Sequence, residues 1–318
     1  MGGKHIPEDI IVDILSRLPV KSLCRFRCVS KRWRSIVSDP QFAKVQFKVA
    51  SEQKTLSRRL LLCRNTSEIE SFDLETPWYA DTHFLRKLTG PFEYRERPPF
   101  VNVLGSCNGL VCVATRYPLT CFYIWNPSTG FSHNLPDPGF SNETNYISYS
   151  GFGYLPATDD YKVLVAASDI VSPGEEVVVE VKIFSTRAGF WKRIESPFKF
   201  YLTYSTSAAL LEETLHWVCD SVEAVIYAFD LVTEKFREMP TLDQNDNTIH
   251  LLNVDSYGGS LYGFRHGYDA WDSIDLCVMR EYGVSDSWTK LLNINFSNQL
   301  ESEYMHADAS LPLLGYRN

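Results

Sequence analysis

Residues 6–19 have the sequence IPEDIIVDILSRLP, which sets the first element of the fold. Pro7 needs no amide donor in the first turn of a helix, and the two acids after it favour the positive end of the helix dipole. Apolar residues then recur at the spacing of one helical face, and Pro19 ends the segment. The stretch therefore predicts a short amphipathic helix.

Two more helical segments follow this helix. Apolar residues up to Val29 cover most of a helix circumference, and Ser30 is a typical N-cap for a third segment that contains Trp33. We expect Asp39-Pro40 to end that third segment. Three short helices with several apolar faces form too small a core to stand alone, so one face is expected to bury against a partner. The alternative is a helical cap that packs on the rest of this chain.

Charge divides the chain near residue 48. Residues 1–48 carry ten Lys or Arg against four Asp or Glu. The whole chain carries 31 against 39, which leaves 21 against 35 for the remainder. A basic head on an acidic body suits either a nucleic-acid arm or helices that dock on an acidic protein. We favour protein docking, and no nucleic-acid partner, because the bases alternate with apolar residues.

After residue 48 the pattern changes to short β-branched and aromatic runs separated by turn residues. Asn108-Gly109 between two such runs is a strong hairpin signal. The runs form four sets of four: 101–104, 110–114, 122–125 and 131–135; 149–155, 161–167, 177–184 and 190–194; 208–211, 215–218, 225–229 and 236–239; 251–254, 260–264, 274–279 and 288–292. An echo of the repeated turn at Phe72 indicates part of another unit.

A repeated four-stranded unit is what a β-propeller blade requires. The predicted fold is therefore multidomain α + β, with a three-helix block at residues 1–48 and an all-β, kelch-like β-propeller at residues 49–318. A β-sandwich is the alternative for the second part. Five aromatic residues that follow the repeated turns are expected to pack between blades: Phe131, Phe190, Trp191, Phe236 and Trp288.

The sequence offers little support for catalysis. Its seven histidines form no His-x-x-x-His pair and no metal-ligand grouping with cysteine, so we expect no catalytic residue, no cofactor and no metal. No apolar run approaches the ~20 residues of a membrane span, and the eight cysteines suit a reducing compartment. We expect no membrane partner and a location in the cytoplasm or nucleus.

Long polar and aromatic loops between the strands are the better candidates for binding a client protein. Aromatic side chains in such loops are typical interface anchors. The candidate client-binding residues are Tyr146, Tyr201, Tyr204, Tyr268 and Trp271.

The helical block resembles the F-box motif. The resemblance rests on residues 6–10 (IPEDI), 14–15 (IL), 17–23 (RLPVKSL), 26–31 (FRCVSK) and Trp33. It implies docking on a Skp-type adaptor and, through it, on a cullin within an SCF-type ubiquitin ligase. The residues that it places at the adaptor are Pro7, Ile10, Ile14, Leu15, Leu18, Pro19, Leu23, Val29 and Trp33, although some of these must hold the helices together.

The β-rich part resembles the kelch-like F-box-associated domain of plant F-box proteins, the group that includes S-locus F-box proteins. The matching segments include 107–112 (CNGLVC), 125–129 (WNPST), 151–154 (GFGY), 160–163 (DYKV), 215–217 (LHW), 229–231 (FDL) and 278–284 (VMREYGV). The resemblance implies a non-catalytic receptor that brings a client protein to the ligase. Family members usually continue for another blade or so, so C-terminal truncation, blade number and ring closure stay open. A β-propeller enzyme of hydrolase or lyase type and an adaptor-independent interaction protein are the alternatives.

Overall fold

The computed structural model describes residues 6–53, 58–63, 69–73, 85–92, 100–116, 120–140, 146–168, 179–195, 206–219, 225–241, 249–267, 270–295 and 314–317. The chain forms two compact units. One comprises Met1–Asn102, Ser106–Asn134 and Leu313–Asn318, and the other comprises Val103–Gly105 and Leu135–Pro312.

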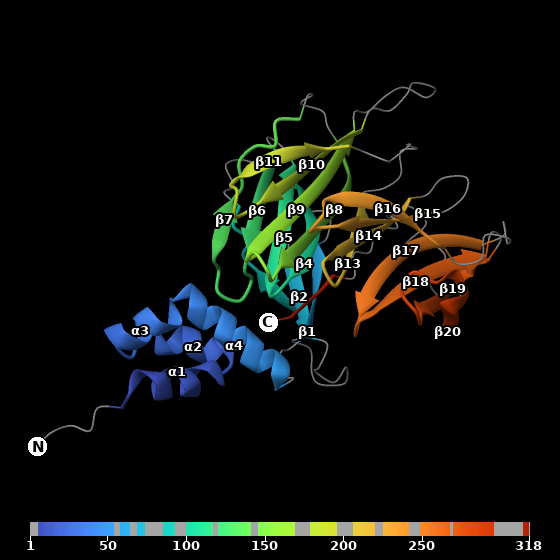
Figure 1. Ribbon diagram of the computed structural model, residues 1–318. Coiled ribbons are helices and arrows are strands. Elements are labelled where there is room, and N and C mark those ends of the chain that lie inside the picture. The colour runs from blue at the N-terminus through green and yellow to red at the C-terminus, as the bar shows by residue number, and fades with distance from the viewer. Residues whose placement is uncertain are drawn as a thin grey trace, which may run out of the picture. The chain divides into compact units, whose positions relative to one another are not determined.

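Four α-helices, drawn in blue in Figure 1, begin the described part of the chain. They are α1 (Glu8–Ser16), α2 (Val20–Phe26), α3 (Lys31–Val37) and α4 (Pro40–Glu52). Pro7 and Pro19 directly precede α1 and α2, as the sequence predicts. Ser30 caps α3, because its hydroxyl accepts a hydrogen bond from the Trp33 amide at 3.1 Å.

The fourth helix corrects the prediction of a three-helix block. Asp39-Pro40 ends the preceding segment as expected, but it also starts α4: the Asp39 carboxylate accepts a hydrogen bond from the Gln41 amide at 2.8 Å. Proline fits here because the first helical position needs no amide donor. The predicted boundary at residue 48 falls inside α4, which continues to Glu52.

Five sheets follow the helices among the described residues (Figure 1). Four of these sheets correspond to the predicted sets of four strands. The predicted fold class is therefore confirmed, and the β-sandwich alternative is not supported. The first set is β4 (Phe100–Cys107), β5 (Leu110–Arg116), β6 (Cys121–Trp125) and β7 (Ser132–Asn134). The second is β8 (Tyr146–Leu155), β9 (Asp160–Ser168), β10 (Val179–Ser185) and β11 (Phe190–Ile194), extended beside β8 by the parallel strand β12 (Thr206–Ser207).

The third and fourth sets follow the same order. The third is β13 (Ala209–Leu211), β14 (Thr214–Cys219), β15 (Val225–Asp230) and β16 (Lys235–Met239). The fourth is β17 (Ile249–Tyr257), β18 (Ser260–Gly267), β19 (Ala270–Met279) and β20 (Trp288–Asn295), with the short 3-10 helix η1 (Ser285–Ser287) before its last strand.

The fifth sheet joins distant parts of the sequence. It has the order β21-β1-β2-β3, with β1 (Arg58–Cys63), β2 (Ile69–Asp73), β3 (Leu85–Leu88) and β21 (Leu314–Arg317). Phe72 lies in β2, so the echo at this residue does belong to a further unit. The antiparallel pairing of β21 with β1, in which Arg58 lies opposite Arg317, completes this unit with a strand from the far end of the β-rich part.

Three of the repeated turns share one backbone conformation. The Asn126 side chain accepts hydrogen bonds from the amides two and three residues later, at 2.9 and 3.1 Å, and Asp230 does the same at 2.8 and 2.7 Å. Gly130 and Gly189 then occupy the left-handed region, each with φ of +76°. The equivalent position of the third set holds Glu234, with φ of +55°, a conformation that costs a non-glycine residue about 1 kcal/mol or more.

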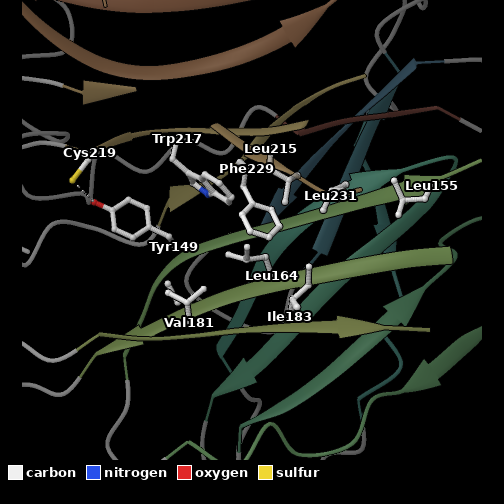
Figure 2. Packing of buried hydrophobic residues seen from close by; sticks show 12 residues of the cluster. Tyr149, Leu155, Leu164, Val181, Ile183, Leu215, Trp217, Cys219, Phe229 and Leu231 are labelled. Carbon is white, nitrogen blue, oxygen red and sulfur yellow. Dashed lines mark hydrogen bonds between the residues drawn. The ribbon is translucent and has the colours of Figure 1, made fainter. Parts of the chain in front are cut away.

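A continuous apolar core joins the second and third sheets (Figure 2). Trp217 of β14 is 1% exposed, and its indole N–H donates to the Ser150 carbonyl of β8 at 2.7 Å. Its neighbours in the core include Tyr149, Leu164, Val181, Ile183, Leu215, Phe229 and Leu231. A second core joins the third and fourth sheets through residues such as Ile226 and Met279.

The aromatic residues after the turns divide into packed and exposed ones. Phe236 and Trp288 pack against the two cores, and the Trp191 ring lies 5.3 Å from the Phe184 ring. Phe131 and Phe190 are 59% and 60% exposed, so the prediction that they pack between blades is wrong. Successive strand residues point to opposite faces, and Trp191 rather than Phe190 takes the packed face.

The described helices are all too short or too polar to cross a membrane.

Candidate functional site

The helical block has a small core of its own. Leu15 is fully buried and Leu23 is 4% exposed, and they pack with Ile11, Ile36 and Phe42. The half-buried side chains around this core include Leu18, Phe26 and Trp33, and the last two rings meet edge to face with centroids 5.5 Å apart. The Gln46 side chain of α4 donates to the Leu18 carbonyl at 3.3 Å and so holds the turn between α1 and α2.

Large apolar side chains also lie on the outside of this block. Ile6, Ile10 and Ile14 are 53%, 49% and 51% exposed, and they recur every four residues. Residues at this spacing lie on one face of a helix, so Ile10 and Ile14 form an apolar stripe along α1 with Ile6 just before it. Val29, after α2, is 61% exposed. These four residues are called the apolar surface of the helical block.

Charged side chains of the helical block are mainly basic and exposed. The exposed bases are Arg17, Lys21, Arg25, Arg27, Lys31, Arg34, Lys44 and Lys48. Arg17 pairs with Asp13 at 2.9 Å one turn away, and Arg32 reaches Glu8 at 3.3 Å. Arg32 also donates to the Ile6 carbonyl at 3.5 Å, which ties the start of α1 to α3. An exposed apolar stripe among bases is suited to a partner with apolar and acidic residues.

The structure sorts the nine predicted adaptor residues by exposure. Five are exposed, namely Pro7, Ile10, Ile14, Pro19 and Val29, and two are half-buried, namely Leu18 and Trp33. Leu15 and Leu23 belong to the core of the block, so their side chains hold the helices together instead of forming its surface. The adaptor contact of the others stays a prediction. Sequence reasoning missed Ile6, although its position beside Pro7 in the F-box-like stretch was a usable signal.

The predicted client residues lie mostly outside the residues that the structure describes. Tyr201, Tyr204 and Tyr268 fall outside the described residues, and the side chains of Tyr146 and Trp271 are not among those described. The backbone shows that these last two are strand residues, at the start of β8 and in β19. The prediction that Trp271 lies in a long loop is wrong, because β18 and β19 run close together there, with Gly267 paired to Ala270.

The segment that follows β7 is held at residues 136–140 by the second sheet. The Lys182 ammonium donates to the carbonyls of Pro138 and Gly139 at 2.8 and 2.7 Å, and it lies 5.0 Å from the centre of the Phe140 ring. The Trp191 indole donates to the Pro136 carbonyl at 2.7 Å. These contacts hold residues 136–140 against β10 and β11.

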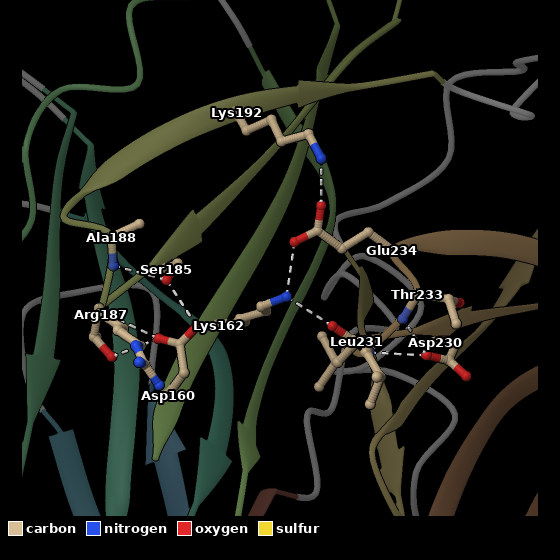
Figure 3. A network of polar contacts seen from close by, with 12 residues as sticks. Asp160, Lys162, Ser185, Arg187, Ala188, Lys192, Asp230, Leu231, Thr233 and Glu234 are labelled. Atoms are coloured by element: carbon tan, nitrogen blue, oxygen red, sulfur yellow. Dashed lines mark hydrogen bonds and ion pairs between the residues drawn. The ribbon is translucent and has the colours of Figure 1, made fainter. Parts of the chain in front are cut away.

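A polar network connects the second sheet to the third (Figure 3). Glu234 bridges two lysines: its carboxylate lies 2.7 Å from the Lys162 ammonium and 2.6 Å from that of Lys192. Lys162 is 8% exposed and also donates to the Leu231 carbonyl at 2.7 Å. Burial raises the pKa of Glu234, but the two lysines outweigh it, so the pKa lies below its ordinary value. This network holds the scaffold together.

A second contact joins the third sheet to the segment that follows β19. His216 is fully buried, with Nδ1 3.2 Å from the Ala209 carbonyl and Nε2 2.7 Å from the Tyr282 hydroxyl. Burial lowers the pKa of His216 to about 4, so the ring is neutral at pH 7. Arg237 donates to the same hydroxyl at 2.7 Å. Each ring nitrogen therefore has a partner, which is the arrangement of a structural histidine.

The described segments contain no group of three or more His, Cys, Asp or Glu side chains placed to hold a metal ion.

A helical block with an outward apolar surface, followed by repeated four-stranded blades, defines a two-part class of β-propeller proteins. The chain belongs to the F-box proteins that carry an F-box associated beta propeller domain: the F-box domain matches residues 4–44, and the propeller domain matches residues 58–314.

Proteins of similar sequence support this assignment. An F-box/kelch-repeat protein of Arabidopsis thaliana is 28% identical over 99% of this chain and 86% of its own length. F-box protein CPR1 of the same plant is 31% identical over 93% of this chain and 75% of its own length. Among solved structures, a GH32 beta-fructofuranosidase of Bombyx mori is similar at 12% identity over 60% of this chain and 49% of that one, with a TM-score of 0.38, which is too low to carry an argument.

Proposed function

We propose that this protein is the substrate-recognition subunit of an SCF-type ubiquitin ligase. Its helical block docks on a Skp-type adaptor, which links it to a cullin, and its propeller domain binds a client protein that is ubiquitinated and degraded. The observation that carries the proposal is the apolar surface of the helical block. This surface lies outside a core whose residues all come from the block itself.

The energy of docking follows from that surface. Fully burying a large aliphatic side chain contributes roughly 1.5–3 kcal/mol. Ile6, Ile10 and Ile14 are about half exposed, so each has about 1 kcal/mol left to gain on a partner. Val29 adds a similar amount. Together with the exposed bases of the helical block, these contributions suit a specific contact with an adaptor that presents apolar and acidic residues.

The propeller contributes proximity. Holding a client beside a ubiquitin-charged enzyme raises the local concentration of its lysines without any covalent step on this chain. We therefore propose a non-catalytic role, in the cytoplasm or the nucleus. A propeller enzyme with a helical cap and an adaptor-independent interaction protein are the competing functions, and neither is favoured by a specific observation.

A matched pair of substitutions tests adaptor docking. Ile14→Asp puts a charge into the apolar stripe, whereas Val45→Asp makes the same kind of change on α4, where the side chain is 45% exposed. We expect Ile14→Asp to weaken binding of a purified Skp-type adaptor by about tenfold or more. Val45→Asp should bind like the parent chain, and both variants should unfold at the same temperature as the parent.

The outcomes separate the proposed function from an adaptor-independent one. Equal adaptor binding by the parent and Ile14→Asp, or no binding by the parent, refutes docking through this surface. If the parent binds the adaptor, affinity purification under proteasome inhibition followed by mass spectrometry is expected to recover the cullin and a client together. Recovery of a client without adaptor or cullin identifies an adaptor-independent interaction protein.

A further inference from the structure

The outer strands of the sheets differ in length and charge. Each described sheet ends in one such strand: β3, β7, β11, β16 or β20. The first four have the sequences LRKL, SHN, FWKRI and KFREM, so they are short, and each is either charged or wholly polar. β20 has the sequence WTKLLNIN, with eight residues and one charge. Short or charged edges hinder edge-to-edge pairing, and β20 is the longest of these five strands and carries a single charge.

The side chains of β20 are exposed along nearly its whole length. Every residue from Thr289 to Asn295 is exposed. Among them are three large aliphatic side chains, Leu291, Leu292 and Ile294, at 43%, 46% and 41%. No other strand in the described part of the chain pairs with the outer edge of β20, which lies at the end of the β17–β20 sheet in Figure 1.

The only charge of β20 is paired within its own sheet, with a carboxylate that Arg265 also approaches at 3.5 Å. The Lys290 ammonium lies 2.5 Å from the Asp275 carboxylate of β19. Asn293 donates to the same carboxylate at 2.8 Å. Burial raises the pKa of Asp275, but Lys290 and Asn293 outweigh it and hold the pKa below its ordinary value. A lysine that is paired in this way repels an approaching strand only weakly.

A bulge sets the two faces of β20. The register shifts at Leu291, so Leu292 lies opposite Leu276 and Ile294 lies opposite Ile274 of β19. Asn293 lies opposite Asp275, on the other face. Leu292 and Ile294 therefore share one face of the sheet and lie on either side of Asn293.

This arrangement is complementary to itself. When two copies of β20 run antiparallel about a two-fold axis at Asn293, Leu292 of each copy lies opposite Ile294 of the other. Asn293 lies opposite its own counterpart, and Lys290 falls outside the overlap, so no two lysines meet. Both apolar pairs lie on the same face of the joined sheet, where cross-strand aliphatic pairs are stabilising.

We propose that the outer edge of β20 is a self-association surface, on which a second copy of this chain pairs antiparallel to form one continuous sheet. The contact closes as a dimer, because the described strands of each copy include one outer edge of this kind and the contact is two-fold. An overlap of about five residues buries far less than the roughly 1,200–2,000 Å² of a stable interface. The dimer is therefore weak, with a dissociation constant on the order of 10–100 μM.

Analytical ultracentrifugation of the full chain across a concentration series tests this proposal. We expect the parent to shift from monomer to dimer as its concentration passes through that range. Leu292→Glu and Ile294→Lys should each weaken the dimer by about tenfold or more, because each puts a charge opposite an apolar side chain. A one-to-one mixture of the two variants should dimerise again, since the introduced glutamate lies opposite the introduced lysine. Both side chains are exposed, so the unfolding temperatures should match that of the parent.

Val232→Glu is the control, since this side chain is 59% exposed but lies in the turn between β15 and β16. It should dimerise like the parent. The proposal is overturned if the parent stays monomeric up to several hundred micromolar, well above the expected dissociation constant, or if it forms an open series of larger oligomers. It is also overturned if Leu292→Glu and Val232→Glu behave alike, or if the mixed variants fail to recover the dimer.

Discussion

Replacing Glu234 tests how the second and third sheets are held together. This residue stands at a left-handed turn position, with φ of +55°, where the two equivalent turns have glycine. Its carboxylate reaches Lys162 at 2.7 Å and Lys192 at 2.6 Å. The Lys162 and Glu234 side chains are 10% and 20% exposed, whereas that of Lys192 is 60% exposed.

The expected losses in free energy of unfolding follow from these exposed fractions. Removing one partner of a fully buried ion pair costs about 3–5 kcal/mol, and the slight exposure of this pair reduces the cost of Glu234→Ala to roughly 2–4 kcal/mol. Glu234→Gly loses the same pair but relieves about 1 kcal/mol of backbone strain, so it should be the milder change. Lys192→Met removes only an exposed partner and should cost below about 1 kcal/mol.

Urea unfolding of the full chain, followed by tryptophan fluorescence, gives these differences in free energy of unfolding. Glu212→Gly is the matched control, because Glu212 is exposed and also left-handed, with φ of +46°. It should stabilise the chain by roughly 0.5–1 kcal/mol through the backbone alone. The reasoning is refuted if Glu234→Ala lies within about 0.5 kcal/mol of the parent, a surface-substitution effect, or if Glu234→Gly is no more stable than Glu234→Ala.

The same pair predicts a pH dependence. Because the pKa of Glu234 is lowered in the folded chain, its stabilisation is present above the unfolded value of about 4.3 and is lost as the pH falls through the folded value. The difference between the parent and Glu234→Ala should therefore be largest near neutral pH and shrink below about pH 4. A difference that stays constant down to pH 3 contradicts an ionic origin.

Two further substitutions probe the helical core and a buried carboxyl. Leu15→Ala should cost roughly 2–5 kcal/mol, because Leu15 is fully buried; urea unfolding followed by helical circular dichroism measures this, and a loss below about 1 kcal/mol contradicts the core assignment. Burial raises the pKa of Asp255 to about 6, so the folded chain keeps a proton there that the unfolded chain has lost, and stability falls as the pH rises through 6. Asp255→Asn should therefore be more stable than the parent at pH 7 and equal to it near pH 3. If the variant and the parent are equally stable at both pH values, the raised pKa of Asp255 is contradicted.

Much of the fold is predictable from the sequence because its signals are local. Pro7 and Ser30 mark helix starts through their own backbone and side-chain chemistry, and four sets of strands follow from alternation between turn residues. The fourth helix is the element that the sequence did not predict. Asp39-Pro40 ends one segment and caps the next, and a boundary signal by itself does not say which side of it is helical.

The candidate site is less predictable, because exposure is not a local property. Ile14 and Leu15 are adjacent aliphatic residues in α1, yet one is 51% exposed and the other fully buried. The F-box-like pattern includes both. Only the packing of α1 against the other helices shows which one forms the core and which one remains for a partner.

The sequence by itself determined the helix starts, the four repeated strand sets and the membership in a two-part class, since each depends on residues a few positions apart. The tertiary structure alone decided three other features: the pairing of β21 with β1, the bridge from Glu234 to Lys162, and the exposed outer edge of β20. Each of these depends on which distant segments become neighbours. That is set by the burial and hydrogen bonding of whole sheets, which no short stretch of sequence specifies.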